Sequence, residues 1–440
     1  ARIIAEQKYT IAIIRQKGTP PNVSRYLDVI VSPGTNFDFV VEQDDNFITS
    51  IVIDQIRGNY LIGYSAIDVT TAKCYYNEVF GTNEDKFFAL DEVFNYMNMH
   101  KTSEIIVTLV DKNINQKEII DYLELNLKSF HLRNFRPKIT YQNELFKNVF
   151  SIESLLTPIE HLDMERSPLS TESLAILIDF VIAHDSSIIQ KLSNPIKLDV
   201  SRYIYIGNNA LEQLNIIDTT HNLSLIRLIN NTSTAMGKRL LKERITNPIK
   251  DSKELLRRYN LSKELYDFHS PIENELASIY DIERLTRRIK LARLHPFELN
   301  YLYDSLVSIK EIVKFMESYK FITPPCSSDE INSFLASINS TFDLSISGRF
   351  MLKDVDENMI TSGVNLQIDD LNRENKLLLY KLEILKNHIL SFFKSDEKSF
   401  VTINRLDKEG FYISITKNRY NLVKDELLKS HLIIDDKLLL

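Results

Sequence analysis

Apolar and polar residues alternate in short runs over roughly the first third of the chain, which is the pattern of β-strands. The runs are rich in β-branched and aromatic side chains, and turn residues separate them. The predicted strands cover residues 9–15, 27–31, 47–55, 60–69, 73–80 and 104–110. A helix is predicted over residues 85–99. Together these segments predict a mixed α/β domain that ends near residue 150.

From residue 154 onward the apolar residues recur with the period of an α-helix, about 3.6 residues. The side chains on one such helical stripe are Leu174, Leu177, Ile178 and Val181. Further helices are predicted over residues 208–214, 223–229, 235–245, 252–268, 280–293, 296–319 and 329–340. The sequence therefore predicts a large helical region from about residue 155 to residue 365.

The segment after Gly363 has the most regular pattern in the chain. Two sets of residues recur every seven positions: Ile368, Asn375, Leu382 and Ile389, and Leu371, Leu378, Leu385 and Phe392. This heptad predicts a helical arm of about 30 residues, roughly 45 Å long, with an apolar seam that needs a partner. Strands are predicted over 399–403 and 410–415. A coiled coil with a β-stranded tip is the simplest interpretation.

Composition supports a mostly helical body. Glycine accounts for 10 of 440 residues, about 2% against a usual 7% or so, and glycine-rich turns are therefore few. The formal charge is −7, which argues against a uniformly basic nucleic-acid coat. Cys74 and Cys326 are far apart, which argues against a disulfide framework and suits a reducing compartment. No apolar run is long enough to span a bilayer. Because the chain opens on Ala1 without a leader, we expect a fragment or a processed chain.

The sequence offers little catalytic chemistry. Gly237 and Lys238 form a Gly-Lys pair, but the spacing of a phosphate-binding loop fails on both sides, and no other such loop is present. The nine histidines do not have metal-ligand spacing. Asp68 ends a predicted strand, as the metal-holding aspartate of ribonuclease-H-like nucleases does. With Asp54 and Asp111 it makes a nuclease an alternative hypothesis, although no spacing forces the three carboxylates together.

Positive charge is concentrated in two stretches. The longer one, residues 227–258, has nine bases and three acids: Arg227, Lys238, Arg239, Lys242, Arg244, Lys250, Lys253, Arg257 and Arg258 against Glu243, Asp251 and Glu254. A solvated helix face is its usual interpretation. The shorter stretch follows the arm and comprises Lys417, Arg419, Lys424 and Lys429, with Arg405 and Lys408 just before it. Bases at a projecting tip suit contacts to a nucleic-acid backbone.

Several strings of the sequence resemble the MutS family of mismatch-repair proteins. Residues 224–241, S-L-I-R-L-I-N-N-T-S-T-A-M-G-K-R-L-L, are similar to the family's core string, and residues 281–285, D-I-E-R-L, to its D-L-E-R-L. Residues 30–35, I-V-S-P-G-T, resemble the opening of the family's connector domain, and residues 410–415, G-F-Y-I-S-I, a strand of its clamp. Ala72 departs from the family, which usually has Gly there, and so does the pair Asn230-Asn231, which replaces more acidic residues.

The resemblance implies an α+β multidomain protein. Residues 1–24 would end an N-terminal domain, 25–153 would form a small ribonuclease-H-like connector, 154–365 an all-α core and lever, and 366–440 the lever arm and the start of the clamp. It implies that the mismatch reader precedes residue 1 and that the ATPase, with ATP and Mg as cofactors, follows residue 440. This chain would then have no catalytic, cofactor or metal site.

The resemblance also implies the partners: double-stranded DNA and a second MutS-type subunit, and no membrane. The expected contacts to the DNA backbone are Lys417, Arg419, Lys424, Lys429, Arg405 and Lys408. A descending helix is expected to begin near residue 421, to run past residue 440 and to cover the seam of the arm. Without that helix, the outer arm should be the least stable element. A coiled-coil interaction scaffold and the nuclease remain the alternatives.

Overall fold

The structure is a computed structural model of the 440-residue chain. It describes all residues except 1–3, 5, 6, 8, 19–21, 39–43, 100, 101, 205, 207–209, 218–222, 320–323, 394–400, 407–409, 430–432, 435, 436, 439 and 440. The chain forms two compact units. Unit 1 comprises Ala1–Ala336 and Ser347–Asp354, and unit 2 comprises Ser337–Ile346 and Val355–Leu440.

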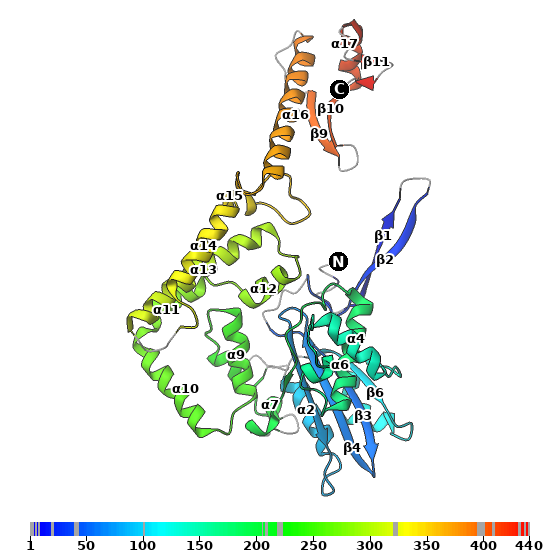
Figure 1. Ribbon diagram of the computed structural model, residues 1–440, viewed down its shortest axis with the longest axis vertical. Coiled ribbons are helices and arrows are strands. Elements are labelled where there is room, and N and C mark those ends of the chain that lie inside the picture. The colour runs from blue at the N-terminus through cyan, green and yellow to red at the C-terminus, as the bar shows by residue number, and fades with distance from the viewer. Residues whose placement is uncertain are drawn as a thin grey trace. The chain divides into compact units, whose positions relative to one another are not determined.

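A six-stranded mixed sheet organises the first part of unit 1 (Figure 1). Its strand order is β7-β6-β3-β4-β5-β8. The strands are β3 Phe47–Ile56, β4 Asn59–Asp68, β5 Lys73–Phe80, β6 Thr102–Leu109, β7 Phe130–Leu132 and β8 Ile196–Lys197. β3, β4 and β5 form an antiparallel meander, β6 runs parallel to β3, and β7 runs parallel to β6. The predicted strands over 47–55, 60–69, 73–80 and 104–110 are thus confirmed.

Alternation along the strands sends side chains to two separate cores. Along β3, Ile48 and Val52 belong to one core, whereas Phe47, Ile51 and Ile53 belong to the other. Helix α2 Phe88–Met99 covers the second face, together with α3 Gln116–Tyr122. Helices α4 Ile139–Val149, α5 Pro158–His161 and α6 Pro168–Asp185 cover the first face. Because helices cover both faces of the sheet, its central strands β3 and β4 are buried at almost every position.

Helix α6 packs directly on the sheet. Gly63 of β4 lets the helix approach so closely that a Cβ built there would lie 2.2 Å from the Leu169 carbonyl carbon. Ser173 then donates from Oγ to the Ser50 carbonyl at 2.7 Å, and its Oγ lies 2.9 Å from that of Ser65. The sequence pattern placed this helix in the helical region after residue 154. In the structure it belongs to the α/β layer, and β8 at residues 196–197 extends that layer further.

A two-stranded ribbon precedes the sheet. β1 Ile11–Lys17 pairs antiparallel with β2 Ser24–Val31. Most of its side chains are exposed on both faces. The predicted strands over 9–15 and 27–31 lie within or overlap this ribbon.

The rest of unit 1 is helical, as predicted. Its helices are α7 Ala210–Gln213, α8 Leu225–Ile229, α9 Ala235–Thr246, α10 Ser252–Leu265, α11 His269–Ala277, α12 Ile282–Lys290, α13 Pro296–Tyr319 and α14 Ser328–Thr341, the last of which runs into unit 2. Side-chain caps start several of them. Thr234 accepts from the Gly237 N–H at the start of α9, and Asp251 does the same for Lys253 and Glu254 at the start of α10.

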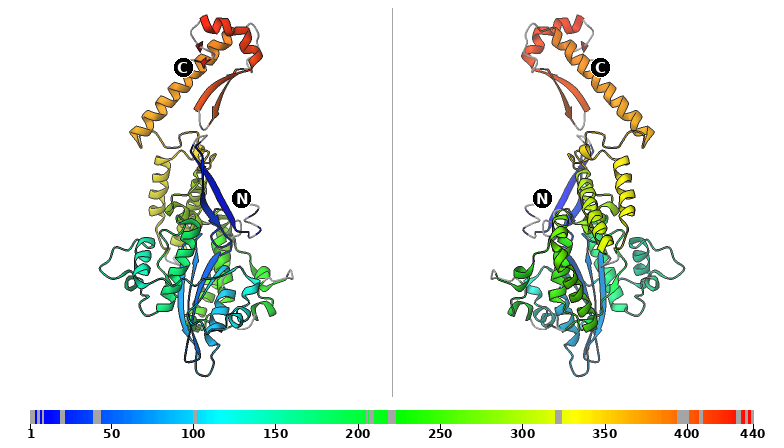
Figure 2. Two further views of the ribbon diagram at one scale, coloured as in Figure 1. Left: turned by 90° about the vertical axis from the view of Figure 1, so that its right-hand side faces the viewer. Right: turned by 90° about the vertical axis from the view of Figure 1, so that its left-hand side faces the viewer.

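Unit 2 is built on α16 Leu366–Ser391, the long helix that the heptad predicted (Figure 2). β9 Val401–Leu406 and β10 Gly410–Ile415 form an antiparallel hairpin, and α17 Lys417–Lys429 comes next in the chain. A small core joins these elements through Ile389, Val401, Val423 and Leu427. A helix is present where the descending helix is expected, since α17 begins at Lys417, four residues before the predicted start. Its predicted continuation past residue 440 is wrong, because the short strands β11 Ile433–Ile434 and β12 Lys437–Leu438 follow α17.

The coarse fold class is therefore confirmed: a mixed α/β first part, a mostly helical remainder and a small β-hairpin near the end. Cys74 and Cys326 are both free thiols. Among the described residues, no helix combines the length and the apolar character needed to cross a bilayer.

Candidate nucleic-acid interface

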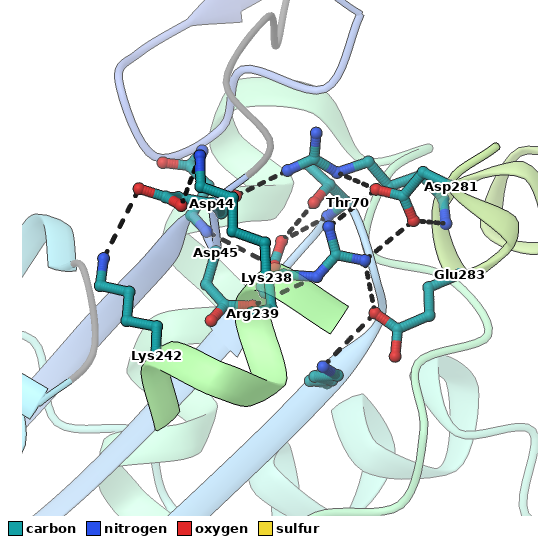
Figure 3. A network of polar contacts seen from close by, with 12 residues as sticks. Asp44, Asp45, Thr70, Lys238, Arg239, Lys242, Asp281 and Glu283 are labelled. Atoms are coloured by element: carbon teal, nitrogen blue, oxygen red, sulfur yellow. Dashed lines mark hydrogen bonds and ion pairs between the residues drawn. The ribbon is translucent and has the colours of Figure 1, made fainter. Parts of the chain in front are cut away.

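The basic stretch at residues 227–258 is not one exposed face, because Arg239 is turned inward. Its side chain, on α9, is only 3% exposed. Arg239 donates from Nη1 and Nη2 to the two carboxylate oxygens of Asp281 at 2.7 and 2.8 Å, and from Nη2 to Glu283 at 2.6 Å (Figure 3). Asp281 is also the N-cap of α12, since it accepts from the Arg284 N–H. The Asp281 carboxylate thus caps α12 and also holds Arg239 of α9 in place.

Acids from the α/β part complete this network. Asp44 lies 3.6 Å from Lys238 Nζ and 3.5 Å from Lys242 Nζ. Asp45 Oδ1 lies 3.8 Å from Arg239 Nε, and Figure 3 shows both aspartates facing α9. Since Asp44 and Asp45 lie three and two residues before the start of β3, the network joins the sheet to α9 and α12.

Arg287 of α12 strengthens the same junction. It is 1% exposed, although it carries a charge. Its guanidinium donates to the backbone carbonyls of Val69, Ile188, Gln190 and Lys191 at 2.6–3.2 Å. Burial lowers the pKa of Arg287 to about 10, so it remains a cation at neutral pH. Arg287 therefore anchors α12 to the chain segments beside α6.

The network also shifts the pKa of its carboxylates. Burial, with the nearby charge of Asp68, raises the pKa of Asp45 to about 6, although three neighbouring cations act against the shift. Burial alone would raise the pKa of Asp281 too, but its hydrogen bonds with Arg239 and the charge of that residue outweigh burial and lower it. The pKa of Asp45 thus lies close to neutral pH, whereas that of Asp281 is held below its usual value.

The remaining bases of the stretch face solvent to a greater extent. Arg257 and Arg258 donate to Glu254 at 2.7 and 2.8 Å on the surface of α10. Arg244 and Lys253 are exposed. The interpretation as a solvated helix face therefore fits α10, whereas Arg239 and its neighbours on α9 are structural. Local charge counting missed the acids that pair with α9, because Asp44 and Asp45 lie nearly 200 residues upstream.

The second basic stretch lies on the hairpin and α17 of unit 2. Val423 and Leu427 turn inward to the small core. At about 100° per residue, Lys417 and Lys424 lie on the same side of that buried stripe, and Arg419 lies on the other side. Lys424 Nζ is 5.9 Å from the centre of the Tyr420 ring. The cations therefore flank the buried side of the helix on two sides.

Arg405 stands on β9 with its guanidinium carbon 5.5 Å from the centre of the Phe411 ring on β10. Lys429 is the last residue of α17, but its side chain is outside the described part of the structure. Lys408 also lies outside the described residues. Of the six predicted contacts, the structure thus describes the side chains of Arg405, Lys417, Arg419 and Lys424.

The three carboxylates of the nuclease hypothesis do not converge. Asp68 pairs in register with Phe47, at the start of β3, whereas Asp54 lies seven residues further along that strand. At about 3.3 Å per residue the two are roughly 23 Å apart. Asp111 comes just after β6, which runs parallel to β3, and so lies toward the Asp54 end. Among the described residues, no group of three or more His, Cys, Asp or Glu could hold a metal ion. The nuclease is therefore not favoured.

Comparisons with known proteins find similarity to the MutS proteins of DNA mismatch repair. The family model described as MutS domain III matches residues 209–406. A mutS homologue, L359, of Acanthamoeba polyphaga mimivirus is 26% identical over 98% of this chain and 43% of its own length. The DNA mismatch repair proteins MutS of Thermosipho melanesiensis and Caldicellulosiruptor bescii are 25% and 23% identical, over 99% and 97% of this chain. The chain spans about half the length of these relatives, or somewhat less.

Proposed function

Since this chain belongs to the MutS family, we propose that it forms the connector, core, lever and clamp regions of a DNA mismatch-repair protein. In this role it holds duplex DNA through the backbone, without reading its sequence. The observation that carries the proposal is the basic tip of unit 2. Residues 410–424 contain Lys417, Arg419 and Lys424 and no acid, on a hairpin and a helix at the end of a long arm.

The sheet supports the finer part of the proposal. An antiparallel meander of three strands, continued by two parallel strands, suits a ribonuclease-H-like connector over residues 25–153. The absence of converging carboxylates among the described residues suits a connector that has no nuclease activity. Since α6 and β8 pack on and pair with this sheet, we extend the connector to about residue 197. We assign the residues from there to 365 to the core and lever, and residues 366–440 to the arm and the start of the clamp.

Phosphate contacts at the tip need cations and have no base specificity. Arg405 and Lys424 each lie over an aromatic ring, which limits the freedom of the side chain before DNA arrives. With Lys429 and Lys408, the sequence of residues 405–429 offers six candidate contacts. Each neutralised phosphate releases counterions, so binding should weaken steeply as salt rises.

We assign ATP hydrolysis, with ATP and Mg as cofactors, to other parts of the full-length protein. The sequence of these 440 residues contains no phosphate-binding loop. The chain itself then acts as a non-enzymatic part that binds DNA, and its further partner is a second MutS-type subunit. Titrating the purified chain with ATP tests the first point, and a saturable ATP isotherm would refute it.

Salt-dependent duplex binding tests the main proposal. A variant with Lys417, Arg419, Lys424 and Lys429 all changed to Ala should bind a mismatch-free duplex more weakly. Its plot of log affinity against log salt should lose up to about 0.9 units of slope per lost contact. The matched control removes four exposed bases of the helical part of unit 1: Arg244, Lys253, Lys263 and Lys290, all to Ala.

The two variants separate the possible outcomes. A reduced slope in the α17 variant alone supports the proposed contacts. A reduced slope in the control alone would move the DNA site to the helices of unit 1. If the unmodified chain bound no duplex even at low salt, the coiled-coil scaffold would become the better hypothesis.

A further inference from the structure

Unit 1 contains a cavity of about 620 Å³, and the charged residues around Arg239 described above do not line it. Its wall is formed by β5, α2, residues 196–204 and the end of α9 with the segment after it. Cavities that bind small molecules have about this size. Neither the proposed DNA contacts nor the charged junction uses this space.

Two buried amides line the cavity without partners. Asn95 of α2 and Asn247, just after α9, are each 6% exposed. Within the described part of the chain, Asn95 Nδ2 and Asn247 Oδ1 have no hydrogen-bond partner. A buried polar atom left in this state destabilises the fold, and such atoms are rare in folded proteins. Asn95 Nδ2 is a hydrogen-bond donor and Asn247 Oδ1 is an acceptor. A ligand with one acceptor and one donor could therefore satisfy both atoms.

The walls beside these amides are aromatic. Tyr75 and Tyr96 line the cavity. Other rings hold both in place: Phe47 lies 5.8 Å from Tyr75, and Tyr64 lies 4.8 Å from Tyr96, centre to centre. Aromatic walls suit a planar ligand, and their apolar character suits a ligand without charge.

We infer that this cavity binds a nucleoside through its base. A nucleobase is planar and neutral, it stacks on aromatic side chains, and its edge presents a donor next to an acceptor. Asn95 Nδ2 would donate to the base and Asn247 Oδ1 would accept from it. This inference goes beyond the proposed function, since it concerns a small molecule and a different set of residues.

The charge of the lining selects between a nucleoside and its phosphates. Five carboxylates and three cations line the cavity: Asp85, Asp91, Glu92, Asp199 and Glu243 against Lys197, Arg202 and Lys250. The resulting excess of negative charge disfavours a phosphate. A neutral nucleoside should therefore bind more tightly than the corresponding nucleotide.

Calorimetric titration of the whole 440-residue chain tests the site, with adenosine and cytidine as probes. Saturable binding of either nucleoside is expected. Adenosine monophosphate should bind with at least tenfold lower affinity than adenosine, and ribose should show no binding. If neither nucleoside binds at millimolar concentration, the cavity holds only water and the inference fails. Equal binding of ribose would also overturn it, because the base would then contribute nothing.

Substitution of the two amides locates the binding. In Asn95→Leu and Asn247→Leu, adenosine affinity should fall at least tenfold while the melting temperature stays equal or rises, since each change removes an unpartnered buried group. The exposed Asn113→Leu is the matched control and should bind as the unmodified chain does. Hydrogen exchange of the unmodified chain gives a test that does not depend on the variants. Adenosine should protect α2 and residues 196–204, and protection confined to other segments would overturn the assignment.

Discussion

Arg239 is a buried cation whose hydrogen bonds lead to two carboxylates of another segment, Asp281 and Glu283. Removing the cation from such a group costs far more than the pair contributes, because Asp281, whose side chain is only 18% exposed, would keep its charge largely buried. We predict that Arg239→Met destabilises unit 1 by about 3–5 kcal/mol. Denaturant unfolding followed by circular dichroism measures the loss.

Arg244 on the same helix provides the control, since it is exposed. Arg244→Met should change the unfolding free energy by less than about 0.5 kcal/mol. If the two variants lost the same stability, the side chain of Arg239 would not be paired with Asp281 and Glu283.

Asp45 gives the junction a dependence on pH. Its pKa is raised from 3.8 to about 6 in the folded chain. Between these values Asp45 keeps a proton in the folded chain that it has lost in the unfolded chain. The contribution of Asp45 to stability is therefore largest below about pH 4, falls as pH rises to 6 and is constant above. We predict that Asp45→Asn removes this decline and stabilises unit 1 at pH 7 by about 2–3 kcal/mol. Denaturant unfolding from pH 4 to pH 8 measures both effects.

Arg239 retains Asp281 and Glu283 in the Asp45→Asn variant, so the junction should stay intact. Asp121→Asn, at an exposed aspartate, should leave the pH profile of the unmodified chain unchanged. An unaltered decline between pH 4 and 6 in Asp45→Asn would assign the titration to another group.

At the scale of single residues, the sequence shows which side chains are charged but does not predict which of them form ion pairs. The strings containing Arg239 and Asp281 could be picked out by their resemblance to a family, yet nothing in the sequence pairs one with the other. Their contact depends on how α9 and α12 pack. The unpartnered amides Asn95 and Asn247 have no sequence signal either, since a buried asparagine and an exposed one look alike in a polar stretch.

At the scale of elements, Gly63 decides how closely α6 lies on β4. A Cβ there would meet backbone atoms, the Leu169 carbonyl carbon at 2.2 Å and the Ser170 nitrogen at 2.3 Å. Backbone cannot move aside as a flexible side chain can. We predict that Gly63→Ala costs at least about 3 kcal/mol in unfolding free energy. Gly81→Ala, whose nearest contact would be 3.1 Å, should cost much less, and equal losses would contradict the close packing.

The same helix shows where prediction of elements from the sequence stops. Strands with alternating residues, such as β3 and β5, are predicted almost to the residue, because their period is set locally. α6 was also expected as a helix. However, α6 is buried on nearly all sides. Its apolar pattern therefore does not show whether the helix packs on a sheet or in a helix bundle. The sequence does not predict the length of α17 either, because no local pattern marks its end at Lys429.

The long helix α16 has two unequal halves. Its second half joins the small core through Ile389, which is 3% exposed, whereas Leu371 in the first half is 65% exposed. We predict that Ile389→Ala costs unit 2 about 2–4 kcal/mol and Leu371→Ala less than about 0.5 kcal/mol. Hydrogen exchange should likewise be faster over 366–384 than over 385–391. Equal protection of both halves in a monomer would mean that the apolar seam already has a full partner.

At the scale of the whole molecule, the two units have cores of very different size. Unit 1 contains two large clusters, one on each face of its sheet. Among the described residues of unit 2, the cluster that joins α16, the hairpin and α17 has four buried members. The area removed from water sets most of the stabilisation, so the smaller core supports the less stable unit.

Because the cores are separate, we predict two unfolding transitions in calorimetry of the whole chain, with unit 2 unfolding first. The variants assign the transitions. Ile389→Ala should lower only the first midpoint, by roughly 4–8 °C for each kcal/mol lost from a unit of this size. Gly63→Ala and Arg239→Met should lower only the second, and the pH dependence from Asp45 should appear only there. A single transition that all three variants shift equally would show that α14, which runs from one unit into the other, couples them into one cooperative body.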